Sequence, residues 1–257
     1  MIEGLFDLAA RAAKRTGLSR VRLEATHVYK HRRPGGEALA RLENKVLAAL
    51  GEPVRIVSGA AWLARENAAW QGLARLEDGC LRVPRAKGQS LTERLAMLAH
   101  SPTEAARAFE AALVSLHALH ARDLTHGDAT TDNVVVSDDG SSAVWIDFEQ
   151  EHLGDALVAR DDDLATLVLS ALTQVDGPVR SALVRALDRH AHVREYARSL
   201  AATRAFLARH TRLPFLMRAR LDGRSTAYRT LRMWRFATTG PTSLVPSPHE
   251  SSTDSES

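Results

Sequence analysis

Two stretches, LTHGDATTDN at residues 124–133 and WIDFE at residues 145–149, carry the strongest fold signal in this chain. Two short apolar runs at residues 133–136 and 143–147 join them, and the polar segment SDDGS at residues 137–141 separates these runs. Short apolar runs on either side of an Asp- and Gly-containing turn indicate a β-hairpin. The sequence therefore predicts a polar loop, a hairpin and a second acidic position, in that order.

A helix is predicted immediately before this segment. The start Ser101-Pro102-Thr103-Glu104 combines a capping Ser, a Pro at the first helical position and a Glu that completes a capping box. Ser90 and Glu93 repeat the capping pattern at the start of a shorter helix. The main helix should run to about Ala121, with a buried stripe formed by Ala105, Phe109, Leu113, Leu116 and Leu119.

Hydrophobic periodicity organises the rest of the chain. It predicts helices over residues 5–15, 37–50, 64–76, 164–172 and 179–208. Alternating apolar and β-branched residues predict a strand or hairpin arm over residues 21–31 and strands over residues 54–58 and 80–83. Residues 237–257 are rich in Ser, Thr, Pro and Glu without periodicity, so we expect a disordered tail there.

The composition is that of an ordinary globular chain. Its 257 residues, 45% apolar and 25% charged, can bury a sizeable core in one two-lobed domain or two small ones. The single cysteine, Cys80, excludes an internal disulfide, and no secretory leader is evident, so we expect a cytoplasmic location. No run approaches the roughly 18 apolar residues of a membrane-spanning helix, so we expect any contact with a membrane to be peripheral.

Basic residues are concentrated in the C-terminal part. The formal net charge is only +3, but residues 194–235 hold eleven Arg against Glu195 and Asp222. Such a stripe could attract polyanions, phosphate-bearing partners or an anionic surface. The alternative is that Arg, in a chain with only four Lys, covers solvated helix faces without a partner.

The combined pattern resembles the catalytic core of the protein-kinase-like superfamily: His126-Gly127-Asp128, four residues, Asn133, a hairpin and Asp147-Phe148. His-Gly-Asp is similar to the motif of aminoglycoside phosphotransferases and lipopolysaccharide-core sugar kinases. Thr130-Thr131 is similar to the KEOPS-complex kinase.

That resemblance implies an α+β, two-lobed fold of atypical bacterial type. An abbreviated N-terminal lobe would occupy residues 1–89, a mostly helical lobe residues 90–236, and the tail residues 237–257. ATP would bind between the lobes.

The same resemblance implies roles for the polar residues of the two stretches. Asp128 would be the catalytic base or the residue that orients a hydroxyl group, while Asn133 and Asp147 would bind Mg²⁺. Mg²⁺ demands hard oxygen ligands, which these side chains supply. His126 would support the loop, and so would Asp163, whose acidic run is expected at the start of a helix.

The resemblance also implies a site without a phosphorylation switch. The Arg of the His-Arg-Asp motif, which reads activation-loop phosphorylation in regulated kinases, is replaced by Gly127. Glu149 stands in the third place of the Asp-Phe-Gly motif, so a flipping activation loop is not expected.

An active enzyme of this kind needs a Lys that holds the nucleotide phosphates and pairs with a helix Glu. Lys30 ends a predicted strand and precedes the helix that carries Glu43, so this pair is the first choice, with Glu66 as the rival partner. Backbone groups near Val83 would meet the adenine. No glycine-rich loop precedes Lys30, which departs from the superfamily pattern.

These features predict an ATP- and Mg²⁺-dependent kinase that phosphorylates a hydroxyl of a protein, a sugar or a lipid-linked acceptor. One alternative is a pseudokinase that acts as a binding or scaffold module, which the missing glycine-rich loop favours. The other is a nucleic-acid-associated protein that uses the Arg194–Arg235 stripe. Intact Asp128, Asn133 and Asp147 favour the enzyme.

Overall fold

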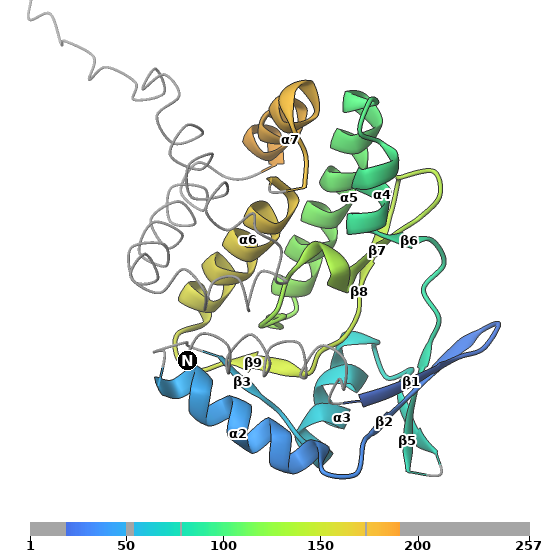
Figure 1. Ribbon diagram of the computed structural model, residues 1–257, viewed down its shortest axis with the longest axis vertical. Helices are drawn as coiled ribbons and strands as arrows, with labels where there is room; N and C mark the ends of the chain where they lie inside the picture. The colour runs from blue at the N-terminus through green and yellow to red at the C-terminus, as the bar shows by residue number, and fades with distance from the viewer. Residues whose placement is uncertain (1–18, 50–53, 78, 173, 191–257) are drawn as a thin grey trace, which may run out of the picture.

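The computed structural model describes residues 19–49, 54–77, 79–172 and 174–190 (Figure 1). Its strands are β1 (Ser19–Leu23), β2 (His27–Arg32), β3 (Val54–Ile56), β4 (Arg75–Glu77), β5 (Cys80–Pro84), β6 (Gln89–Ser90), β7 (Val134–Val136), β8 (Ala143–Trp145) and β9 (Gln150–His152). Its helices are α2 (Gly36–Ala49), α3 (Gly59–Ala69), α4 (Leu91–Met97), α5 (Pro102–His120), α6 (Ala156–Leu172) and α7 (Gly177–His190), with a 3₁₀ turn at Thr131–Asn133. The described part of the chain is therefore α+β with small antiparallel sheets.

The largest sheet places Lys30 beside the apolar strand β5. Strands β1, β2, β5 and β4 lie in that order, and Lys30 on β2 is directly opposite Val21 on β1 and Leu81 on β5. Directly opposite residues of an antiparallel ladder have their side chains on the same face. Lys30 therefore shares the face of Leu81, which joins Val83 and Trp62 of α3 in a small buried cluster.

A second, larger core holds the helices together. It lies among α4, α5, α6, α7 and the β7–β8 hairpin, and these helices stand on one side of the four-stranded sheet (Figure 1). Each fully buried Leu or Phe contributes about 1.5–3 kcal/mol relative to an exposed one. The stripe predicted on α5 is confirmed as buried at Ala105, Phe109, Leu113, Leu116 and Leu119.

The connection between the two cores depends on a glycine. Residues 85–90 lead from β5 to α4, and β6 within them pairs with β7. Gly88 has φ +127°, and a Cβ there would lie 2.0 Å from the carbonyl oxygen of Val136. No side chain fits this close approach, so the strand pairing at the end of the connection requires glycine.

Strand β3 is paired on both of its edges. On one side it forms an antiparallel pair with β9, in which Ile56 is opposite Gln150. On the other side, the Asn44 side chain of α2 donates to the Ile56 carbonyl (3.0 Å) and accepts from the Ile56 N–H (2.6 Å). The Asn44 amide thus takes the place of a further strand and fixes α2 against β3.

Several local predictions are confirmed. The hairpin is formed by β7 and β8 with its turn at residues 137–141. Ser90 and Glu93 make a complete capping box at the start of α4. At Ser101 the helix begins as expected with Pro102, but no side-chain cap is made, so the capping box predicted there is wrong.

Two boundaries were predicted wrongly. The helix expected over residues 64–76 is α3, which ends at Ala69, because Gln71 and Gly72 take positive φ values and turn the chain into β4. The acidic run ending at Asp163 lies inside α6 and not at its start, since α6 begins at Ala156 after Asp155, whose carboxylate accepts from the Leu157 N–H. The helix dipole therefore does not explain this run.

Some expectations fall on other parts of the chain. The helix over residues 5–15, the end of the helix over 179–208, the Arg194–Arg235 stripe and the tail lie outside the described residues. Among the helices that are described, none is long and apolar enough to cross a membrane.

The Asn44 contact can be tested by substitution. We expect Asn44→Ala to lower the free energy of unfolding by about 1–3 kcal/mol, because the buried N–H and carbonyl of Ile56 both lose their partner. Urea denaturation would measure the loss. Asn67→Ala, on the exposed face of α3, is the matched control, and an equal effect of the two substitutions would contradict the assignment.

Candidate active site

Asp163 on α6 holds the backbone of the 124–133 loop in place. This carboxylate, 1% exposed on α6, accepts the backbone N–H groups of His126 (2.6 Å) and Gly127 (2.8 Å). It also accepts from Nε2 of His120 on α5 (3.0 Å) and from Nε2 of His152 on β9 (3.1 Å). One side chain therefore holds the loop, α5 and β9 together.

The surroundings of Asp163 keep it ionised. Burial alone would raise its pKa, but the hydrogen bonds from His120 and His152 outweigh that effect. The pKa of Asp163 is therefore held well below the usual range of a carboxyl group. The predicted supporting role of Asp163 agrees with these contacts.

His126 connects the loop to the residue before Asp147. Its Nδ1 accepts the Asp128 backbone N–H (3.3 Å), so the ring proton is on Nε2, which donates to the Ile146 carbonyl (2.8 Å). The ring packs against Phe148, with centroids 4.7 Å apart. The buried imidazole thus fixes the spacing between the loop and the segment that starts at Asp147.

Gly127 allows the loop to approach β9. Its φ is +84°, and a Cβ would lie 2.9 Å from both the carbonyl carbon and the oxygen of Gln150. Backbone atoms cannot move aside as a flexible side chain can, so no larger residue fits without shifting the loop. This contact is a structural reason for the Gly of His-Gly-Asp.

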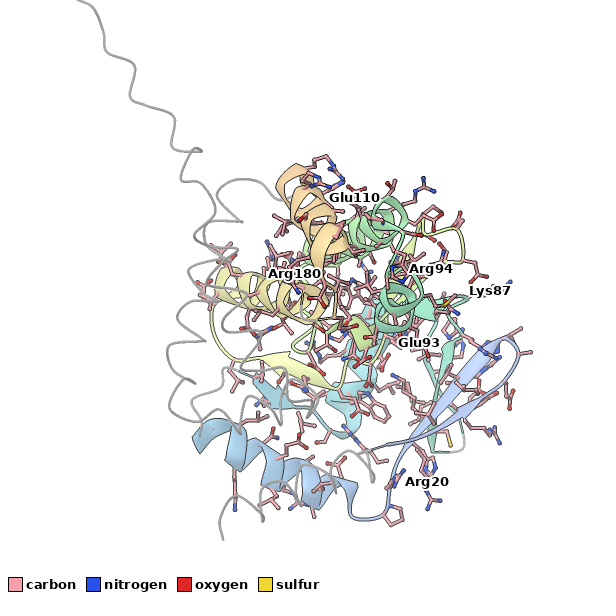
Figure 2. The ribbon with its side chains drawn as sticks, turned by 45° about the horizontal axis from the view of Figure 1, so that its top comes forward. Arg20, Lys87, Glu93, Arg94, Glu110 and Arg180 are labelled. Atoms are coloured by element: carbon pink, nitrogen blue, oxygen red, sulfur yellow. The ribbon has the colours of Figure 1, made fainter. Side chains whose placement is uncertain are left out.

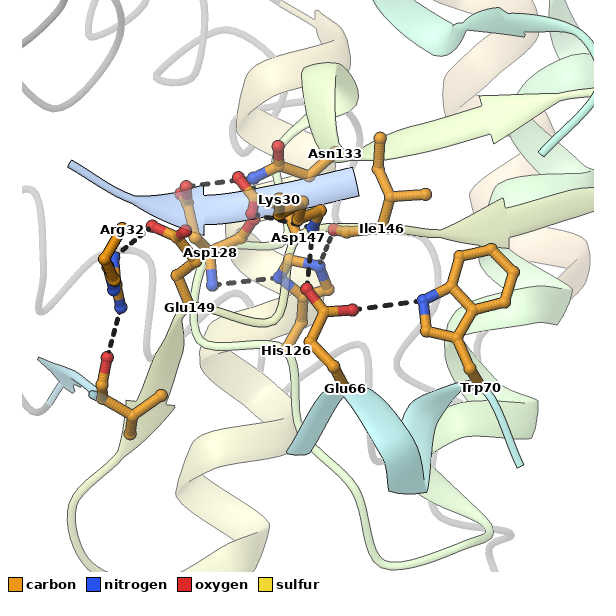
Figure 3. A network of polar contacts seen from close by, with 11 residues as sticks. Lys30, Arg32, Glu66, Trp70, His126, Asp128, Asn133, Ile146, Asp147 and Glu149 are labelled. Atoms are coloured by element: carbon orange, nitrogen blue, oxygen red, sulfur yellow. Dashed lines mark hydrogen bonds and ion pairs between the residues drawn. The ribbon is translucent and has the colours of Figure 1, made fainter. Parts of the chain in front are cut away.

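Asp128 and Asn133 form a hydrogen-bonded pair within the 124–133 loop (Figure 3). The Asn133 Nδ2 donates to the backbone carbonyl (2.9 Å) and to Oδ2 (3.0 Å) of Asp128. Because the amide nitrogen faces Asp128, the amide oxygen is the atom left to bind a cation. The pairing also orients the Asp128 carboxylate.

Asp147 lies opposite Lys30 in a strained backbone conformation. Its φ is +69°, a region that residues other than Gly rarely adopt. Its side chain is 43% exposed, and its Oδ1 lies 3.2 Å from Lys30 Nζ. Burial raises the pKa of Asp147, but the charge and hydrogen bond of Lys30 lower it by a larger amount. The pKa therefore lies below the usual range of a carboxyl group, and the carboxyl is ionised.

Lys30 bridges Asp147 and Glu66. Its Nζ lies 2.7 Å from Oε1 of Glu66, which is 0% exposed and whose Oε2 accepts from Trp70 Nε1 (3.1 Å). Burial lowers the pKa of Lys30, but Asp147 and Glu66 raise it more, so the ammonium group stays charged. The rival assignment is therefore correct, and Lys30 pairs with Glu66.

The expected Lys30–Glu43 pair is wrong. Glu43 lies on α2, a helix inserted between β2 and the helix that carries Glu66. The pKa of Glu43 lies above its usual value, because burial and the charges of Glu149 and Asp128 raise it by more than the charge of Arg32 lowers it. Glu43 therefore belongs to a group of charges around Arg32.

Arginine side chains tie α3 to the rest of the site. Arg65, next to Glu66, donates from Nη2 to the Thr125 carbonyl (2.6 Å) in the loop. Arg122, just after α5, donates to the carbonyls of Ala68 and Ala69 at the end of α3. The sequence contains no local signal for these contacts, because each joins residues far apart in the chain.

The face of the sheet that carries Lys30 has exposed apolar surface. Val21 and Leu23 on β1 are 58% and 62% exposed and lie on the Lys30 face, since Val21 is directly opposite Lys30. Leu23 continues across the sheet to Val28 and Val83. A flat apolar group could therefore lie against this row beside the charged cluster, next to the position predicted for adenine.

The oxygen donors of Asn133 and Asp147 are too few to hold a metal ion by themselves, but they suit Mg²⁺, which takes its other ligands from water and substrate. The amide oxygen of Asn133 and the partly exposed Asp147 carboxylate are hard donors on a short loop and a hairpin end. Mg²⁺ is commonly held by one or two carboxylates together with waters and substrate phosphates. Among the described residues, no group of three or more His, Cys, Asp or Glu could hold a metal ion.

Comparison with known proteins provides no further assignment. No known protein family matches this chain, and no curated protein matches it either.

The Asp163 contacts predict a pH dependence of stability. At neutral pH, we expect Asp163→Asn to lower the free energy of unfolding by about 3 kcal/mol or more, because four donors lose a charged acceptor. The folded pKa of Asp163 is depressed, so the unfolded state takes up this proton first as the pH falls.

The difference between wild type and Asp163→Asn should therefore be largest above about pH 5 and shrink toward pH 2. Urea denaturation across this range measures it. Asp132→Asn, exposed in the same loop, is the control. A difference that does not change with pH would contradict the role of the Asp163 charge.

Proposed function

We propose that the chain is an ATP- and Mg²⁺-dependent phosphotransferase with a two-lobed protein-kinase-like fold, acting on a hydroxyl group. The observation that carries the proposal is Lys30, whose ammonium group lies 2.7 Å from Glu66 and 3.2 Å from Asp147. Asp147 in turn lies near the Asp128–Asn133 pair (Figure 3). Phosphoryl transfer depends mainly on positioning and charge stabilisation, which such a fixed cluster supplies.

Each side chain has a role that its contacts support. Lys30, held by Glu66, would bind the phosphates of the nucleotide. Asp147 and the Asn133 amide oxygen would hold Mg²⁺, and the Asp128 carboxylate would orient the acceptor hydroxyl and accept its proton. Bound Mg²⁺ would neutralise charge on the transferred phosphoryl group.

The arrangement of the sheet also supports this function. The apolar row Leu23, Val28 and Val83 lies on the face of Lys30, so a purine ring against it would direct its phosphates toward the lysine. The acceptor could be a protein, a sugar or a lipid-linked sugar, since all present a hydroxyl group.

A pseudokinase is the second candidate. The β1–β2 turn consists of Glu24, Ala25 and Thr26, and the Glu24 N–H is bonded to the His27 carbonyl (2.9 Å). This turn has neither the glycines nor the free N–H at Glu24 that would cradle a phosphate. The observation favours a module that binds nucleotide weakly, or binds a partner, without transfer. The nucleic-acid hypothesis stays a prediction, because its Arg stripe lies outside the described residues.

Nucleotide binding is the first test. Mg²⁺-ATP at about 100 times its dissociation constant should stabilise the wild type by about 2.7 kcal/mol, or roughly 5–10 °C in melting temperature. Asp147→Asn should lose the Mg²⁺-dependent part of this shift, whereas Asp138→Asn in the exposed hairpin turn should retain it. No shift in the wild type would refute the proposal.

Catalysis is tested separately from binding. Asp128→Asn should bind Mg²⁺-ATP as the wild type does but lose transfer, because it removes the proton acceptor and leaves both metal ligands in place. The measurement is ADP release in the presence of hydroxyl acceptors, with calorimetry for binding. Wild-type binding without turnover on any acceptor would favour the pseudokinase.

A further inference from the structure

Two ion pairs, one beside the other, join β2 to the segment that contains Asp147. Lys30 and Arg32 are two residues apart on β2, so their side chains lie on the same face. Asp147 and Glu149 are also two residues apart. Lys30 Nζ contacts Asp147 Oδ1 (3.2 Å), and Arg32 Nη1 contacts Glu149 Oε2 (3.1 Å). Figure 3 shows both pairs at the same end of β2.

Arg32 is itself fixed on several sides. Its Nη2 donates to the Val57 carbonyl (2.5 Å), and its guanidinium carbon lies 4.7 Å from the centre of the Trp62 ring. Its Nε lies 3.7 Å from Oε1 of Glu37 on α2. Only 12% of the side chain is exposed. A planar guanidinium suits this arrangement, because it can stack and donate in two directions at once.

Glu149 is held by its main chain as well as its side chain. Its carbonyl accepts the Val57 N–H (2.8 Å), while its carboxylate, 14% exposed, pairs with Arg32. Val57 thus binds Glu149 with its N–H and Arg32 with its carbonyl. Arg32, Val57 and Glu149 therefore each contact the other two, and these contacts fix the chain at Glu149, two positions after Asp147.

Asp147 needs such support because of its backbone. A non-glycine residue in the left-handed region is strained and persists only where its surroundings hold it. On one side, the Ile146 N–H donates to the Asn133 carbonyl (2.9 Å) and the Ile146 carbonyl accepts from His126. On the other side, the contacts of Glu149 restrain the chain. Lys30 restrains only the carboxylate.

Arg32 also balances a surplus of negative charge. Glu37, Glu43 and Glu149 surround this one guanidinium, and Asp128 is close enough to affect Glu43. Loss of Arg32 would remove a positive charge from among these carboxylates. Repulsion would then push the segment that carries Asp147 away from β2.

The geometry points to Arg32 as a positioning residue that acts through Glu149 to hold Asp147 in the orientation that binds Mg²⁺. This inference rests on the proposed function, since it concerns the same metal site. In the described part of the chain, Arg32 forms no hydrogen bond or ion pair with Asn133 or Asp147, and it acts on Asp147 only through its charge, so its loss should weaken Mg²⁺ binding without removing a ligand. Substitution of residues that orient metal ligands lowers metal affinity by about 10- to 100-fold.

The test measures the Mg²⁺ concentration that gives half-maximal binding of a non-hydrolysable ATP analogue, by calorimetry. Arg32→Met should raise that concentration about tenfold or more. Binding of the analogue in EDTA should match the wild type, because Lys30 and Glu66 are unchanged. Arg180→Met is the matched control: Arg180 on α7 also pairs with one carboxylate, Asp176, and donates to one carbonyl, that of Val175 (2.5 Å), outside the site.

Two further variants test the route through Glu149. Glu149→Gln should reproduce the effect, and the double variant with Arg32→Met should be no worse than either single one, because both remove the same interaction. Arg32→Lys should restore part of the Mg²⁺ affinity, since Lys keeps the charge but not the fork. If Arg32→Met does not fold, Glu149→Gln carries the test with the same expectation.

The outcomes separate this inference from the proposed function. A wild type that binds the analogue identically with and without Mg²⁺ would refute the metal site and the proposed function together. A Mg²⁺-dependent wild type whose midpoint is unchanged in Arg32→Met and Glu149→Gln would refute only the role of Arg32. Equal shifts in Arg32→Met and Arg180→Met would also refute it, because they would reflect general destabilisation.

Discussion

The buried carboxylate of Asp163 is the contact on which the rest of the site depends. A charge inside a protein is tolerated only when hydrogen bonds replace the water that it loses. Asp163 gains four donors, and they come from α5, the 124–133 loop and β9. None of these elements can move away without leaving the charge unsatisfied, so one side chain sets the relative positions of all three.

Strand β9 extends this constraint to the other side of the site. His152 at its end is bound to Asp163, while its backbone pairs with β3, next to the Lys30-bearing sheet. Gly127 permits the loop to lie against Gln150 of the same strand. Only residues 153–155 separate β9 from α6, so the chain passes from Asp147 to α6 in a short segment.

Arginines supply much of the connection between distant elements. Arg65 and Arg122 bind backbone carbonyls and so attach α3 to the loop and to the end of α5, while Arg32 attaches β2 to Glu149. Each guanidinium can donate in several directions at once, which a lysine cannot do. The described Arg residues near the site therefore act in its architecture, a use that net charge and composition did not indicate.

The sequence by itself determined the elements whose signals are local. Apolar periodicity predicts α5 and its buried stripe, the Asp-Gly turn predicts the β7–β8 hairpin, and the Ser90–Glu93 spacing predicts the cap of α4. It also singled out Asp128, Asn133 and Asp147, which the structure brings close together.

Only the tertiary structure decided which charges meet. Lys30 reaches Glu66 across 36 positions and Asp147 across 117, and Glu43, which is nearer in the sequence, lies elsewhere. Spacing along a chain predicts contacts within one helix or hairpin, because the local geometry is fixed. Pairing between separate elements depends on how their apolar faces pack, and that packing places Glu66 of α3, and not Glu43 of α2, against the lysine.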